Sequence, residues 1–195
     1  MNPELEGFLH TLHSQGVEHD ASKTDRLERR RNLDPETAEF VAMLMRLMSA
    51  RNVVEVGTSN GYGTIWLADA MKETGGRVTS LDVNPQDEAI ANTTQAGVQE
   101  SVDFVQQDAG EYLVKTPDDS VDVLFLDGER TEYAGWWPHP VRVLRPGGLM
   151  LIDNAHKPSP EELADFVALL ETDPNIEQLT LEIGSGLILA RKKQS

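Results

Sequence analysis

The stretch Val53-Val54-Glu55-Val56-Gly57-Thr58-Ser59-Asn60-Gly61-Tyr62-Gly63 decides the fold. An apolar, β-branched run meets a glycine-rich turn, and apolar residues at helical spacing follow from Ile65 to Met71. This is the pattern of a strand, a tight loop and a helix. Glycine can adopt positive φ and leaves the backbone open to a ligand. Because the helix directs its N–H groups and the positive end of its dipole at the loop, we expect the loop to receive a carboxylate or a phosphate.

The spacing of the glycines bears on the identity of that ligand. A nicotinamide-binding fingerprint reads Gly-x-Gly-x-x-Gly, whereas this chain has Gly57-x-x-x-Gly61-x-Gly63, with Glu55 two residues before the first glycine. An acidic residue followed by Gly-x-x-x-Gly resembles the first motif of S-adenosylmethionine-dependent methyltransferases. The loop taken alone leaves open any other nucleotide binder of the doubly wound type.

Composition limits the class of protein. The 195 residues suit a single domain with a sizeable core. A net charge of −16 repels phosphate backbones, so a nucleic-acid partner is not expected. The absence of cysteine excludes disulfides, thiolate metal sites and a cysteine nucleophile. No apolar stretch approaches membrane-spanning length, so we expect a soluble, cytoplasmic protein without a membrane partner.

Strand and helix patterns alternate along the rest of the chain. Such alternation implies a parallel sheet covered by helices, with ligands at the carboxyl ends of the strands. We therefore expect an α/β, Rossmann-like doubly wound, mostly parallel seven-stranded sheet with an antiparallel C-terminal hairpin and helices on both faces. The strands are expected at residues 53–56, 77–81, 101–106, 121–126, 149–152, 178–183 and 187–190.

Several local patterns also make predictions. Before the first strand, apolar residues predict a short helix up to Leu12, followed by a bend from Gly16 to Thr24. The arginines between Arg26 and Arg31 indicate either a solvated helix face paired with neighbouring acids or a site for an acidic substrate or partner. Further on, Arg145-Pro146-Gly147-Gly148 predicts a turn, and Ser159-Pro160-Glu161-Glu162 predicts a capping box that begins a helix.

Acidic residues follow the second and third predicted strands. Asp82 lies 25 residues after Gly57, close to the roughly 20-residue separation of an acid that binds ribose hydroxyls. We favour ribose binding over a simple turn residue at this position. Asp108 follows the third strand, where its carboxylate could accept a hydrogen bond from an adenine amino group or cap the next helix.

Oxygen-bearing side chains also follow the fourth and fifth predicted strands. Asp127 ends the fourth strand, and Asp153 and Asn154 end the fifth. Two adjacent strands would bring these three side chains together, and hard oxygen ligands suit Mg²⁺, Mn²⁺ or Ca²⁺. The alternative is that strand-end acids cap their own loops.

The order of these motifs is more specific than any one of them. Glu-x-Gly-x-x-x-Gly-Tyr, an aspartate after the second strand, Leu-Asp-Gly and Leu-Ile-Asp-Asn together resemble the metal-dependent catechol and caffeoyl-CoA O-methyltransferase family. The match runs from about Asp34 to Asn154 and weakly through Leu187. The resemblance implies a homodimer, with a helical cap at residues 1–33 and a class I methyltransferase domain at 34–195. It implies donor-binding residues Glu55, Gly57, Thr58, Ser59, Gly61, Gly63, Thr64, Asp82, Asp108 and Asp127, and metal ligands Asp127, Asp153 and Asn154.

The resemblance also implies a reaction. A divalent metal, with Mg²⁺ the first choice, would chelate two vicinal oxygens of a small-molecule acceptor such as a catechol and lower the pKa of one. The resulting oxyanion would attack the sulfonium methyl of S-adenosylmethionine. A metal-independent small-molecule methyltransferase and a donor-binding module without turnover stay open as alternatives.

Two positions depart from the pattern of that family. The family usually has a lysine three residues after the first metal aspartate, where this chain has Arg130. Arginine does not deprotonate in proteins, so Arg130 could orient the acceptor or stabilise its oxyanion but not act as a base. The family often has serine after Gly-Tyr, where this chain has Gly63 and then Thr64, so Thr64 or backbone N–H groups would contact the donor carboxylate. His156, three residues past Asp153, is a candidate base.

Overall fold

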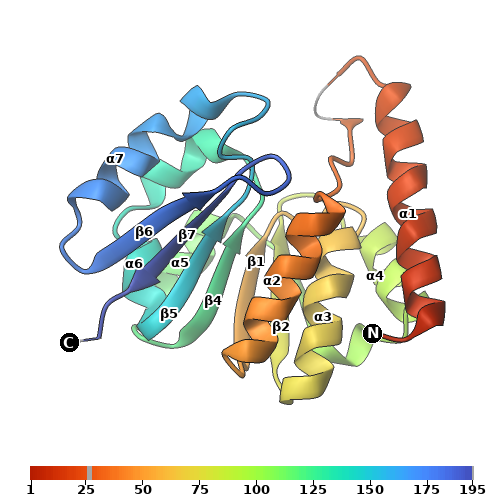
Figure 1. Cartoon of the computed structure of the whole chain (residues 1–195), viewed down its shortest axis with the longest axis horizontal. Coiled ribbons are helices and arrows are strands. Elements are labelled where there is room, and N and C mark those ends of the chain that lie inside the picture. Colours follow the sequence, from red (N-terminus) through yellow and green to blue (C-terminus); the bar gives the residue numbers. More distant parts are fainter. Residues whose placement is uncertain (26–27, 195) are drawn as a thin grey trace.

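One mixed sheet forms the centre of the molecule (Figure 1). The structure is a computed structural model that describes residues 1–25 and 28–194, and within these residues seven strands are ordered β3-β2-β1-β4-β5-β7-β6. Neighbouring strands from β3 to β5 run parallel, and β7 runs antiparallel to both β5 and β6. The expected fold class is confirmed. The strands are β1 (Asn52–Val56), β2 (Arg77–Asp82), β3 (Val102–Gln106), β4 (Val121–Leu126), β5 (Leu144–Ile152), β6 (Ile176–Leu181) and β7 (Leu187–Lys192).

Helices cover both faces of the sheet and bury two hydrophobic cores (Figure 1). Successive strand residues point to opposite faces, so Val53 packs with α1, α2 and α3, whereas Val54 packs with α5, α6 and α7. The α-helices are α1 (Pro3–Ala21), α2 (Pro35–Leu47), α3 (Tyr62–Thr74), α4 (Asp87–Gln95), α5 (Ala109–Lys115), α6 (His139–Val143) and α7 (Ala164–Thr172). Short 3₁₀ helices are η2 (Gln99–Ser101), η3 (Arg130–Trp136) and η4 (Pro160–Leu163).

The expected bend after Gly16 is wrong, because α1 continues through this glycine to Ala21. Gly16 is buried, and a β-carbon at this position would lie 2.2 Å from the side-chain nitrogen of Asn32. The glycine therefore permits a close approach of the chain segment that follows the helix, and it does not interrupt the helix.

Two other local predictions also need correction. The expected turn at 145–148 lies within β5, where the pairing with β4 shifts from Val121 opposite Leu144 to Val123 opposite Leu149. These residues form an irregularity of the strand. The expected capping box is absent, because Ser159 makes no side-chain capping bond and Glu162 binds Arg130 instead.

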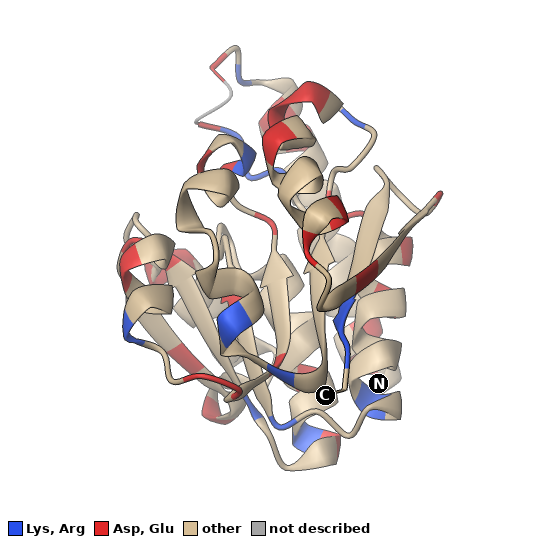
Figure 2. Cartoon of the chain, turned by 90° about the vertical axis from the view of Figure 1, so that its left-hand side faces the viewer, with Lys and Arg blue, Asp and Glu red and all other residues tan. Residues whose placement is uncertain are grey.

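Charge is spread widely over the molecule. In Figure 2 acidic residues lie on helices, strands and loops and do not gather in one patch, in keeping with the net charge of −16. Among the described residues, every helix is either too short or too polar to span a lipid bilayer.

Candidate active site at the carboxyl ends of the strands

A cavity of about 780 Å³ opens at the carboxyl ends of β1, β2, β4 and β5. Its size falls in the range of small-molecule sites, roughly 300–1,000 Å³. Most residues expected from the sequence line it, whereas Gly61, Thr64 and His156 are not among its lining residues. The expected residues that line it are Glu55, Gly57, Thr58, Ser59, Gly63, Asp82, Asp108, Asp127, Arg130, Asp153 and Asn154.

The loop between β1 and α3 requires glycine for steric reasons. Gly57 has φ +99°, and a β-carbon there would lie 2.2 Å from the main-chain oxygen of Asp127. Gly61 caps α3 with φ +83° and leaves only 3.0 Å between its would-be β-carbon and Ala89. The loop therefore packs closely against both the β4 end and α4.

Asp82 braces this loop from the end of β2. Its Oδ2 accepts hydrogen bonds from the backbone N–H groups of Thr58 at 3.1 Å and Ser59 at 3.2 Å. Its Oδ1 accepts from the backbone N–H of Asn84 at 2.9 Å. The structure thus places Asp82 beside the glycine loop, as expected, and ribose binding stays a prediction.

Glu55 lies beneath the loop as the centre of a buried hydroxyl network. Its Oε2 accepts hydrogen bonds at 2.6 Å from Thr64 Oγ1 and from Ser80 Oγ. Thr58 Oγ1 lies 2.6 Å from Ser80 Oγ and accepts from Gln86 Nε2 at 2.7 Å. Burial raises the pKa of Glu55 to about 7, although the two hydroxyl groups oppose that shift. Thr64 therefore supports Glu55 and does not face the cavity.

Asp108 is both a cap and a cavity residue. Its Oδ1 accepts a hydrogen bond from the backbone N–H of Glu111 at 2.8 Å, at the start of α5. The capping interpretation is confirmed, and contact with an adenine stays a prediction, since Asp108 also lines the cavity.

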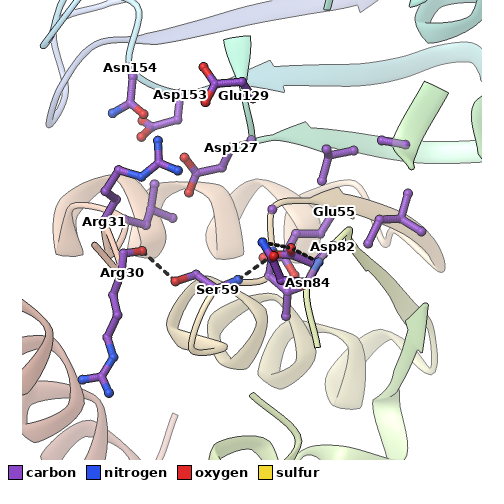
Figure 3. A pocket seen from close by; sticks show the side chains of 18 of the residues that line it. Arg30, Arg31, Glu55, Ser59, Asp82, Asn84, Asp127, Glu129, Asp153 and Asn154 are labelled. Atoms are coloured by element: carbon purple, nitrogen blue, oxygen red, sulfur yellow. Dashed lines mark hydrogen bonds between the residues drawn. The ribbon is translucent and has the colours of Figure 1, made fainter. Parts of the chain in front are cut away.

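Asp127, Asp153 and Asn154 converge on one another across the ends of β4 and β5 (Figure 3). Burial raises the pKa of Asp127 well above its usual value, and the charge of Asp153 raises it further. Burial also raises the pKa of Asp153 to about 7. The Oδ1 atom of Asp153 is buried and has no hydrogen-bond partner in the described part of the chain.

These features fit a cation at this position. Two buried carboxylates that repel each other, with one oxygen lacking a partner, are stabilised by a positive ion between them. Within residues 1–25 and 28–194, no group of three or more His, Asp or Glu side chains is arranged to hold a metal. A metal here would therefore depend on the two aspartates together with the amide of Asn154.

Arg31 is a cavity residue that the sequence did not single out by itself. One interpretation of Arg26 to Arg31 was a solvated helix face, but residues 29–31 carry no helix, and Arg26 lies outside the described residues. Arg31 points toward Asp127 and Asp153 (Figure 3), and its charge partly offsets the rise in the pKa of Asp127 that burial causes. The sequence offered the arginine cluster as a site for an acidic substrate, but it gave no signal that Arg31 would approach Asp127 and Asp153, because the contact joins residues far apart in the chain.

His156 is not brought together with the other expected residues. Its side chain is exposed, and its Nε2 lies 3.0 Å from a carboxylate oxygen of Glu182. Its ring packs against Gly186 in the turn between β6 and β7. A role of His156 as a base stays an untested prediction, and the geometry of the cavity does not favour it.

The fold, a seven-stranded mixed sheet between helices, is similar to that of solved methyltransferases. The chain belongs to the O-methyltransferase family, whose model matches residues 10–193. It is thus an enzyme of the S-adenosylmethionine-dependent methyltransferase class.

Individual relatives and solved structures agree with this assignment. Tapetum-specific methyltransferase 1 of Arabidopsis thaliana is 28% identical, over 78% of this chain and 74% of its own. A catechol O-methyltransferase of Niastella koreensis is 30% identical, over 63% of this chain and 58% of its own. The fold is similar to that of an O-methyltransferase from Bacillus cereus solved with S-adenosylhomocysteine, with a TM-score of 0.77, 23% identity and coverage of 99% and 92%.

Proposed function

We propose that this chain transfers a methyl group from S-adenosylmethionine to one of two vicinal oxygens of a small-molecule acceptor, such as a catechol, with the help of Mg²⁺. Asp127, Asp153 and Asn154 would hold the cation. The observation that carries the proposal is the buried Oδ1 of Asp153, which has no partner among the described residues and belongs to a carboxylate whose charge acts on Asp127. The catechol O-methyltransferase of Niastella koreensis supports a catechol-like acceptor.

The cation, when bound, would chelate the acceptor oxygens and lower the pKa of the one that reacts. The other contributions come from the chain itself. Gly57 lets the loop pack against the main chain of Asp127 at the end of β4, and Asp82 holds the loop N–H groups of Thr58 and Ser59 in place. Because methyl transfer from a sulfonium to an oxyanion neutralises charge, close placement of the reactants and exclusion of water contribute most to the rate.

Calorimetric titration of the metal-free chain with Mg²⁺, in the presence of S-adenosylhomocysteine, tests the metal. We expect binding to one site, and Asp153→Asn should weaken it by more than the roughly 10- to 100-fold that a partner of a metal ligand contributes. Asp103→Asn removes a carboxylate on β3 that pairs with Arg77 and does not line the cavity, so it is the matched control and should bind Mg²⁺ as the wild type does.

Turnover measured with a panel of catechols distinguishes the alternatives. Activity that disappears with a chelator and returns with Mg²⁺ supports the proposal. Activity that persists with the chelator would favour a metal-independent enzyme. In such an enzyme the positive charge of Arg31, which lies beside Asp127, would take the place of the cation. Donor binding without methylation of any catechol would contradict the acceptor that we propose.

A further inference from the structure

The guanidinium of Arg130 is buried beside the cavity and connects three segments of the chain. Its Nε donates a hydrogen bond to Glu162 Oε2 at 3.0 Å, and its Nη2 donates to the same oxygen. Its Nη1 donates to the main-chain oxygens of Asn154 at 3.3 Å and Lys157 at 3.4 Å. The side chain is only 6% exposed. Arg130 therefore joins η3, η4 and the loop that follows β5, and most of its N–H donors are occupied by these contacts.

That loop carries Asn154 in an unusual conformation. Asn154 has φ +62°, in the left-handed region, which is uncommon for residues other than glycine and which asparagine adopts more readily than most. Arg130 binds its carbonyl group on one side. On the other side the next residue, Ala155, donates its backbone N–H to Gly186 at 2.9 Å, in the turn between β6 and β7. With the backbone held from both sides, the Asn154 amide lies beside Asp153 (Figure 3).

We infer that Arg130 is a positioning residue. Its guanidinium binds the Glu162 carboxylate and the Asn154 carbonyl at the same time, and this fixes the position of the Asn154 amide next to Asp153. Arg130 thereby sets the geometry of the part of the cavity that would bind the cation and the acceptor. The inference rests on the proposed metal site. A lysine could not do the same, because one ammonium group does not span a carboxylate and two carbonyl oxygens, as a planar guanidinium with five N–H groups does.

The test measures Mn²⁺ binding and S-adenosylhomocysteine binding separately by calorimetry, on the wild type, Arg130→Lys and Glu162→Gln. We expect Mn²⁺ affinity to fall roughly 10- to 100-fold in both variants, the range for loss of a group that orients a metal ligand. Affinity for S-adenosylhomocysteine should not change, because the hydrogen bonds that Arg130 makes within the described residues go to Glu162, Asn154 and Lys157 and not to the glycine loop or Asp82. The electron paramagnetic resonance spectrum of bound Mn²⁺ should change shape as its ligand set is displaced.

Arg142→Lys is the matched control. Arg142 is also a partly buried arginine that donates to main-chain oxygens, those of Leu113 and Thr116, and to the carboxylate of Asp118, but it does not line the cavity. Loss of these guanidinium contacts in Arg142→Lys should lower the melting temperature and leave the affinity for Mn²⁺ as in the wild type. The comparison separates a specific effect on the metal side from a general loss of stability.

Each outcome bears on one claim. Wild-type Mn²⁺ affinity in Arg130→Lys would overturn the positioning role while leaving the metal site intact. Equal losses of Mn²⁺ and S-adenosylhomocysteine affinity in the Arg130 and Arg142 variants would also overturn it, because they would indicate a general structural effect. A wild-type chain that binds no Mn²⁺ would overturn the proposed metal function, and the inference with it.

Discussion

At the scale of single residues, Glu55 links folding to pH. Its carboxyl group is buried, and its pKa is raised from the ordinary 4.5 to about 7 in the folded chain. The folded state therefore binds the proton more tightly than the unfolded state. The resulting stabilisation is fully present below about pH 4.5 and is lost as pH rises through about 7, for a total of about 3 kcal/mol.

Urea unfolding of the metal-free chain between about pH 5 and pH 8 tests this linkage. The free energy of unfolding should fall with rising pH in the wild type and fall less steeply in Glu55→Gln. The buried carboxyl groups of Asp127 and Asp153 contribute in the same direction in both proteins. Because the charge of Glu55 also raises the pKa of Asp127, the difference between the two slopes reports Glu55 together with its effect on Asp127. Parallel slopes in the two proteins would contradict the raised pKa.

The residues that the sequence could predict are those defined by the end of a strand. Asp82, Asp127 and Asp153 each follow an apolar run, and parallel strands end at one edge of the sheet, so their approach follows from topology. Ser80 and Arg31 could not be found in this way. Ser80 lies within a strand, and its bond to Glu55 depends on the register of two strands. Arg31 reaches the cavity through a segment without regular structure.

At the scale of elements, the segment 28–34 borders the cavity between α1 and α2. Asp20, near the end of α1, accepts hydrogen bonds from two backbone N–H groups of this segment. Its Oδ1 accepts from Arg30 at 2.7 Å, and its Oδ2 accepts from Arg31 at 2.8 Å. The segment also accepts a bond at the Arg30 carbonyl from Ser59 Oγ of the glycine loop, at 2.7 Å. Asp20 thus fixes a segment that contacts the expected donor loop directly.

Replacing Asp20 with alanine should release this segment. We expect faster amide hydrogen exchange in residues 28–34 and weaker binding of S-adenosylhomocysteine, because two backbone bonds are lost and each contributes about 1 kcal/mol. Exchange measured by mass spectrometry and affinity measured by calorimetry check both effects. Ser22→Ala, which removes a side-chain bond to the His19 carbonyl at the end of the same helix, is the control. Unchanged exchange in Asp20→Ala would show that other contacts fix the segment.

Two local predictions from the sequence are wrong at this scale. Gly16 was expected to bend the chain, and Ser159 and Glu162 to cap a helix, because both patterns are local signals. In each case a distant residue decides the outcome: Asn32 packs against the bare face of Gly16, and Arg130 binds the carboxylate of Glu162. Tertiary contacts of this kind leave no periodic pattern in the sequence.

At the scale of the whole molecule, the excess of acidic side chains opposes compactness. A net charge of −16 on a chain of this size produces repulsion that salt screens. The exposed ion pairs, such as Arg77 with Asp103, are also screened, but each contributes only about 0–1 kcal/mol. Repulsion should therefore dominate the response to salt.

The melting temperature at about pH 8 should rise when NaCl is increased from about 0.01 M to about 0.1 M, since the screening length falls from about 30 Å to about 10 Å. Scanning fluorimetry measures this. The same series near pH 4, where many carboxylates are protonated, should show a smaller rise. A melting temperature that falls with salt at pH 8 would mean that attractive ion pairs outweigh the repulsion.

The position of β7 has a consequence for biosynthesis. This strand lies between β5 and β6, and β6 pairs with no other strand of the described sheet. During synthesis, β6 therefore leaves the ribosome before β7, the strand with which it pairs. The sheet is completed only after residue 192 has left the exit tunnel, because β6 is joined to the rest of the sheet through β7 alone among the described strands.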